Sequence, residues 1–304
     1  NLAVGVNALY LLTTGTYNTA VGNSAGAAIT TGVQNTLIGG LAGDALTSSN
    51  SNTVVGYGAL SSATTADLNV AMGHSALVTN ILSDRNVAIG NDALATHNVA
   101  STADGYNTAV GYSAGTAVTT GIQNTFIGGL AGDANTTASN NTAVGYVSLT
   151  ANTTGHSNVA LGVASLQANT TASENTAVGY ASLNANTTGA SNTATGFYSL
   201  VVNTTGASNT ASGYKALQAN TTGSSNVALG RDALYANTTA ANNTAVGYAS
   251  LGANTTGASN VAVGTNAGLA SIDGAQCVVI GMDAMKTATS DDGAVVVGYL
   301  AGRD

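Results

Sequence analysis

The side chains that could act as nucleophiles, bases or metal ligands are few and widely separated. The three histidines, His74, His97 and His156, show none of the short spacings that bring metal ligands together. We expect each to be a solvated variant of a repetitive position. The one cysteine, Cys277, excludes an internal disulfide. It stands where most copies of a repeated motif have asparagine, so we expect a buried variant position and not a nucleophile.

The carboxylates supply neither a catalytic pair nor a cation site. The 13 acidic residues do not recur in register, as those of a repeated calcium loop do. Asp44 and Asp133 hold equivalent places in a duplicated block and Asp291–Asp292 is isolated, so we expect turns there. Sugar cleavage by paired carboxylates finds little support in so few acids. We therefore predict no catalytic residue, no metal and no cofactor, and expect a protein that is not an enzyme.

Composition excludes two further classes of partner. Only 5 basic residues occur in 304, and the formal net charge is −8, so no basic surface for nucleic acid can form. No apolar run approaches the roughly 18 residues that indicate a membrane span. We expect neither nucleic-acid binding nor a membrane span in this chain.

The scattered side chains described above are carried by copies of one unit. The motif N-[TV]-A-[VIL]-G begins at Asn1 and occurs eighteen times at intervals of 17 residues, with weaker copies at Cys277 and Ala294. One interval, from Asn86 to Asn107, is 21 residues long and contains a four-residue insertion. We interpret 1–304 as a single repeat solenoid. Residues 1–106 end with the insertion in 86–106, residues 107–276 are regular, and residues 277–304 form divergent terminal repeats. Repeats are numbered 1 to 18 from Asn1, and positions from the first residue of each motif.

The unit reads N-[TV]-A-V-G-Y-x-[AS]-L-x-A-N-T-T-G-x-S, which is typical of short strands and turns. Its β-branched residues alternate over positions two to four, and Gly, Asn, Thr and Ser disfavour helix. The sequence predicts an all-β fold, a parallel β-solenoid or β-roll of eighteen 17-residue coils.

Two columns of identical residues should hold this solenoid together. Asparagines at the first position can bond from coil to coil through their amides, and we predict a ladder of Asn141, Asn158, Asn175, Asn192, Asn209, Asn226, Asn243 and Asn260. Tolerance of turn geometry is the alternative reason for these asparagines. Glycine at the fifth position should mark a bend of positive φ or a close backbone approach, at Gly145, Gly162, Gly179, Gly196, Gly213, Gly230, Gly247 and Gly264.

Alternation along each strand divides the side chains between two faces. We place the fourth position inside the coil, with the second position half buried beside it and the ninth-position leucine as an apolar plug. The predicted core is Val144, Leu149, Leu161, Val178, Leu183, Leu229 and Val246. The opposite face, of Asn, Ala and Gly, would then suit close packing against another copy of the chain. Sixth-position tyrosines would form an inter-chain contact or an exposed row.

Three motifs carry a family resemblance. Asn86-Val-Ala-Ile-Gly90, Asn158-Val-Ala-Leu-Gly162 and Asn260-Val-Ala-Val-Gly264 resemble the S-V-A-I-G motif of YadA-like head repeats in trimeric autotransporter adhesins. Similar N-T-A-x-G arrays occur in bacteriophage tail fibres. The resemblance covers the whole chain, although the adhesin repeat is shorter and lacks the N-T-T-G segment. It implies a left-handed homotrimer, extracellular, at a cell surface or on a virion. It also implies a rigid stalk or adhesive head that binds a host-surface glycan or receptor.

The recurring Thr-Thr pairs, from Thr119-Thr120 to Thr255-Thr256, leave an alternative open. Flat threonine columns on a β-solenoid resemble ice-binding surfaces. Adjacent strand residues point to opposite faces, however, so each face would receive one threonine per coil. We expect a structural fibre first, and an ice-binding solenoid or a glycan-binding tail fibre as alternatives.

Overall fold

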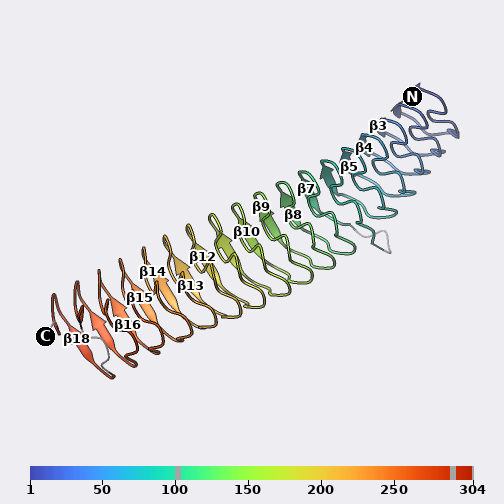
Figure 1. Cartoon of the computed structure of the whole chain (residues 1–304). Coiled ribbons are helices and arrows are strands. Elements are labelled where there is room, and N and C mark those ends of the chain that lie inside the picture. Colours follow the sequence, from blue (N-terminus) through green and yellow to red (C-terminus); the bar gives the residue numbers. More distant parts are fainter. Residues whose placement is uncertain (100–103, 288–291, 303–304) are drawn as a thin grey trace. The chain divides into compact units, whose positions relative to one another are not determined.

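The computed structural model describes residues 1–99, 104–287 and 292–302 and contains, within them, only strands and turns. The chain divides into two compact units, Asn1–His156 and Ser157–Asp304. Each coil of the solenoid carries one strand of three residues, at positions two to four of the repeat (Figure 1). The all-β, parallel solenoid predicted from the sequence is confirmed.

The first unit holds nine parallel strands, each paired with the next in register. The partners lie 17 residues apart except at the insertion, where Val87 pairs with Thr108. These strands are β1 (Leu2–Val4), β2 (Thr19–Val21), β3 (Thr36–Ile38), β4 (Thr53–Val55), β5 (Val70–Met72), β6 (Val87–Ile89), β7 (Thr108–Val110), β8 (Thr125–Ile127) and β9 (Thr142–Val144).

The second unit repeats the arrangement with nine more parallel strands, again paired in sequence order. They are β10 (Val159–Leu161), β11 (Thr176–Val178), β12 (Thr193–Thr195), β13 (Thr210–Ser212), β14 (Val227–Leu229), β15 (Thr244–Val246), β16 (Val261–Val263), β17 (Val278–Ile280) and β18 (Val295–Val297). Beyond the strands, backbone hydrogen bonds continue around the coil, as from Leu217 N–H to the Ala233 carbonyl at 3.0 Å.

Two of the seven predicted core residues lie in the core. Leu149 and Leu183, the ninth-position leucines, are fully buried as expected. The fourth-position residues were placed on the wrong face. Leu229 is exposed, and Val144, Leu161, Val178 and Val246 are only partly buried. The third-position alanines point inward instead, and Ala143, Ala160, Ala177 and their equivalents are fully buried.

The narrow coil explains why alanine, and not valine, faces inward. The leucine at position nine already fills the space opposite the strand, so only a small side chain fits across from it. The two largest third-position side chains stand in repeats whose ninth residue is glycine, in the pairs Leu37 with Gly43 and Phe126 with Gly132. The smaller valines Val54 and Val279 still leave room for Leu60 and Met285. A Cβ added at Gly132 would lie 2.5 Å from Phe126 Cε1. The first-position asparagines and third-position alanines therefore line the interior and are unavailable to another chain.

The fifth-position glycine is required by both of the predicted reasons. At the eight predicted glycines, φ lies between +128° and +143°, a region that side chains disfavour. Successive turns also touch here, since a Cβ on Gly162 would lie 2.5 Å from the Gly179 carbonyl oxygen. Any side chain at this position would collide with the backbone of the next coil.

The predicted asparagine ladder is present and fully buried. The Asn175 Oδ1 atom accepts the Asn192 backbone N–H at 2.9 Å, and Asn192 Nδ2 donates to the Gly206 carbonyl at 2.8 Å. The bond to the backbone N–H recurs along the ladder, for example from Asn260 N–H to Asn243 Oδ1 at 2.9 Å. The Nδ2 bond recurs at most of the predicted ladder asparagines, although Asn175 Nδ2 has no hydrogen-bond partner. The amides thus bond within and between coils, which favours the ladder over turn tolerance as the reason for asparagine.

The predictions for the histidines are partly wrong, whereas the prediction for the cysteine is confirmed. His74 and His156 are exposed as predicted, but His97 is fully buried, because it takes the inward-facing twelfth position. Cys277 is buried in place of a ladder asparagine, as expected, and its backbone N–H donates to Asn260 Oδ1 at 2.9 Å. Asp44, Asp133 and Asp292 lie in turns, while Asp291 lies outside the described residues.

Candidate functional site

The residues singled out from the sequence are structural and offer little to a ligand. The ladder asparagines and the core leucines are buried, and the amides are engaged by neighbouring coils. The asparagines of the N-T-T segments fit a glycosylation sequon, yet they too are fully buried. A binding site must be sought where the chain departs from its repeat.

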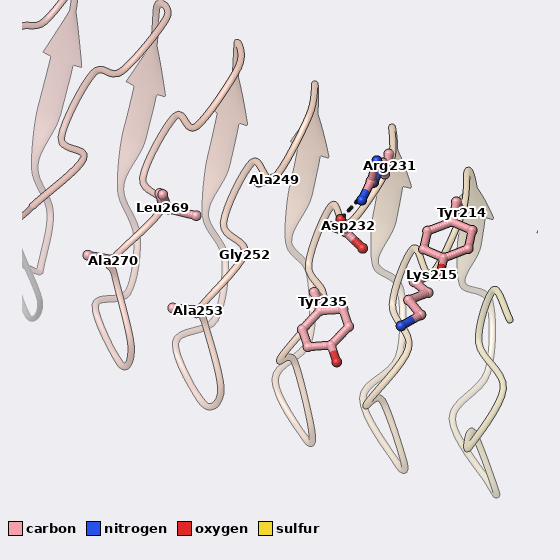
Figure 2. Close-up of a pocket in the computed structure, with 10 residues that line it drawn as sticks. All are labelled: Tyr214, Lys215, Arg231, Asp232, Tyr235, Ala249, Gly252, Ala253, Leu269 and Ala270. Carbon is pink, nitrogen blue, oxygen red and sulfur yellow. Dashed lines mark hydrogen bonds and ion pairs between the residues drawn. The ribbon is translucent and has the colours of Figure 1, made fainter.

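The clearest departure is a groove of about 630 Å³ in repeats 13 to 16, within the second unit (Figure 2). It is lined only by positions six, seven, ten and eleven, which belong to the turn segment after each strand. The lining residues are Tyr214, Lys215, Arg231, Asp232, Tyr235, Ala249, Gly252, Ala253, Leu269 and Ala270. The groove therefore opens on the turn segments and not on the strands.

The charged groups are held at one end of the groove. Arg231 takes the sixth position, where neighbouring repeats have tyrosine, and its guanidinium lies 5.4 Å from the Tyr214 ring and 5.8 Å from the Tyr248 ring. Its Nε donates to Asp232 Oδ2 at 3.1 Å. Stacking between two rings and an ion pair together restrict the guanidinium to one place.

Lys215 adds a second cation beside the arginine. Its ammonium nitrogen lies 5.3 Å from the centre of the Tyr214 ring. With Asp232 as the one carboxylate, the lining residues carry two positive charges and one negative charge. Two of the five basic residues of the chain thus meet in one groove of an otherwise acidic protein.

Small residues form the floor, and large residues form the walls. Tyr235 occupies the tenth position of repeat 14, and the next repeat has Gly252 there. The repeat after that has Leu269, whose Cδ1 lies 3.0 Å from where a Cβ on Gly252 would stand. The sequence of Tyr, Gly and Leu at one position creates a hollow between two walls, with alanines completing the floor (Figure 2).

Sequence reasoning missed this site, although a signal was present. Charged residues at positions six and seven are rare among the repeats, and three occur together at Lys215, Arg231 and Asp232. The motif describes the residues that the repeats share, whereas the groove is formed largely by residues that differ from the motif. The sixth-position row itself is exposed, and Tyr180, Phe197 and Tyr214 stack at 5.3 Å and 5.5 Å between successive ring centroids.

A second charged cluster lies beside the insertion in the first unit, and its carboxylates accept hydrogen bonds from backbone N–H groups. Asp67 Oδ1 accepts the Asn50 N–H at 2.6 Å, and Asp84 Oδ1 accepts the Asp67 N–H at 2.7 Å. Burial, followed by the nearby Asp67 and Asp104 charges, raises the pKa of Asp84. Arg85 forms an ion pair with Asp104. These carboxylates connect consecutive turns, and the described residues include no group of three or more His, Cys, Asp or Glu that could hold a metal ion.

Together these features define a β-solenoid repeat protein with an irregular groove in repeats 13 to 16. No protein-family model and no curated protein matches the chain. Over the part of the chain described above, no helix is long and apolar enough to cross a membrane.

Proposed function

We propose that this chain is a structural fibre element that assembles with copies of itself through the outer face of its strands. We further propose a homotrimer with no catalytic role, located outside the cell, at a cell surface or on a virion, where it acts as a stalk or adhesive head. One observation carries the assembly: in each of the two units, the outward side of the strands forms an uncharged surface of apolar and threonine side chains.

This surface, called the strand stripe, consists of the second and fourth positions of every repeat. Its members are Thr, Val, Ile, Leu, Met and one Ser, and none is charged. Seven of the large fourth-position side chains in the middle repeats are 36% to 40% exposed, namely Ile38, Met72, Ile89, Ile127, Leu229, Val263 and Ile280. Monomeric proteins rarely leave an apolar patch of this extent in water.

A second copy of the chain is the occupant that best fits the stripe. The stripe repeats with the period of the coil, so a partner must offer apolar side chains at the same period, as another copy does. Closed symmetric assembly would cover the stripe on every chain. The resemblance to adhesin head repeats supports three chains, and the resemblance to tail fibres supports a surface or virion location.

The threonine pairs favour a fibre over an ice-binding surface. The first threonine of each pair donates its hydroxyl to a backbone carbonyl of the next coil, as Thr204 Oγ1 does to the Thr221 carbonyl at 3.0 Å. In the pairs from Thr136-Thr137 to Thr255-Thr256 only the second threonine, such as Thr205, is exposed, whereas both members of Thr119-Thr120 are exposed. A column of exposed pairs, which ice-binding solenoids commonly present, therefore does not form along these repeats.

The mass of the folded particle tests the proposal. Light scattering at several concentrations should give about three times the chain mass of 29.3 kDa. A particle of 29.3 kDa that keeps its β-sheet signal at every concentration would overturn the assembly.

A further inference from the structure

The groove of repeats 13 to 16 combines features that a structural coil does not need. Two cations, the exposed Tyr235 ring and a floor of small residues come together over four consecutive repeats. The charged side chains and the tyrosine rings contribute neither to the ladders nor to the core. A hollow with a few convergent polar groups is the ordinary form of a ligand site.

We propose that this groove binds an acidic saccharide, with a sugar carboxylate at Arg231 and Lys215 and a sugar ring against Tyr235. Arginine's planar fork of donors matches a carboxylate, and here Tyr214 and Tyr248 already hold the guanidinium in place. Asp232 accepts a hydrogen bond from Arg231 Nε. The two terminal nitrogens of the guanidinium are the atoms that would bind the sugar carboxylate.

The rest of the groove suits a flat hydroxylated ring. Tyr235 presents an exposed aromatic face, against which the C–H face of a sugar can pack, and its hydroxyl can bond to the sugar. Asp232 can accept hydrogen bonds from sugar hydroxyls. At a coil spacing of about 4.8 Å, four repeats span roughly 14 Å, which is enough for a short oligosaccharide.

The groove and the strand stripe use different positions of the repeat. Positions six, seven, ten and eleven line the groove and positions two and four form the stripe, so both surfaces can be used by one chain. The inference rests on the adhesive part of the proposed function. Self-assembly and saccharide binding can nevertheless be disproved independently of each other. Particle mass tests the assembly, whereas ligand titration tests the groove.

Titration of the whole chain with trigalacturonate tests the proposal. Its fully methyl-esterified form is the matched neutral probe, and triglutamate is a peptide of similar charge. Trigalacturonate should bind at least about tenfold more tightly than the ester, which lacks the charged hydrogen bond to Arg231. It should also bind more tightly than triglutamate, which lacks a sugar ring to pack against Tyr235. Binding should weaken with added salt.

Variants locate the binding within the groove. Arg231→Gln and Tyr235→Ala should each weaken trigalacturonate binding by about tenfold or more. Lys286→Gln makes the same charge change elsewhere, and Tyr146→Ala removes an exposed tyrosine of the first unit, so both should bind like the unaltered chain. No binding, equal binding of the ester or of triglutamate, or equal losses in the controls would overturn the proposal.

Discussion

At the scale of single residues, buried amides connect the coils in two separate columns. The first-position asparagines form one column and the twelfth-position asparagines form the other. In the second column Asn203 Nδ2 donates to Asn186 Oδ1 at 2.8 Å and to the Gly206 carbonyl at 2.9 Å. Its own Oδ1 accepts from Asn220 Nδ2 at 2.8 Å. The Asn203 amide therefore bonds to groups in three coils.

Replacing one of these amides should cost more than its own hydrogen bonds. Asn203→Ala would leave Asn186 Oδ1 and one N–H of the Asn220 amide unsatisfied, whereas the Gly206 carbonyl keeps its bond from Asn192 Nδ2. Buried groups without partners cost about 1–3 kcal/mol each. We expect a loss of roughly 2–4 kcal/mol in the free energy of unfolding, measured by urea titration of the second unit's transition. Thr205→Ala, at an exposed neighbouring position, should change it little. Equal effects of the two variants would contradict the ladder's role.

His97 should make the first unit sensitive to acid. Burial lowers the pKa of its ring from 6.5 to about 4, so the folded protein binds fewer protons than the unfolded chain between these values. Stability should fall as the pH drops from 6.5 towards 4, by on the order of 3 kcal/mol. Its Nε2 lies 3.1 Å from Ser83 Oγ, and Nδ1 has no hydrogen-bond partner.

Substitution identifies the source of that sensitivity. His97→Asn restores the residue most common at the twelfth position, so it should flatten the dependence of the melting temperature on pH between 7 and about 4. His74→Asn, at an exposed site, is the control and should leave the dependence unchanged. An unaltered pH profile in His97→Asn would rule out this histidine as the cause.

At the scale of the coil, the strand and the turn segment share a fixed interior volume. The ninth-position leucines adopt φ of +49° to +53°, and Gly132 has nearly the same value at +58°. Leucine can therefore occupy that backbone position. What prevents it at Gly132 is the Phe126 ring, which is fully buried and lies where a side chain would begin.

A double substitution tests the exchange of volume. Phe126→Ala alone should cost about 3–5 kcal/mol of stability by leaving a cavity, and Gly132→Leu alone should destabilise by overpacking. The double variant recreates the common Ala and Leu pair and should recover more than half of the summed loss. Urea unfolding of the three variants gives the coupling energy, and simple additivity would contradict the account.

The same exchange explains what the sequence could and could not predict about the fold. The position of each strand, the bend at Gly162 and the bond from Asn192 to Asn175 follow from the motif and were predicted correctly. The prediction placed Val144 inside and Ala143 outside, which is the reverse of the structure. The error arose because the larger apolar side chain was expected to face inward. The pairing of Phe126 with Gly132 already indicated that the third and ninth positions share one space.

At the scale of the whole molecule, the same 17-residue repeat carries two different surfaces, the strand stripe and the groove. Each coil bonds to its neighbours, so stability should accumulate from local contacts in each unit. The strand stripe repeats without interruption by charge, whereas the groove interrupts the repeat at Arg231 and Tyr235. The groove could not be predicted from the motif, because its shape depends on which turn positions from four successive coils lie together.

The most direct test of the central claim is the particle mass of a chain whose strand stripe carries charge. Ile38→Lys, Ile89→Lys and Ile127→Lys combined would place three ammonium groups in the stripe. Thr120→Lys, Thr137→Lys and Thr154→Lys, at exposed second threonines, make the same charge change elsewhere. Light scattering should give 29.3 kDa for the folded stripe variant and the multiple of that mass found for the unaltered chain in the control. A folded stripe variant that keeps the full assembly mass would contradict assembly through the strands.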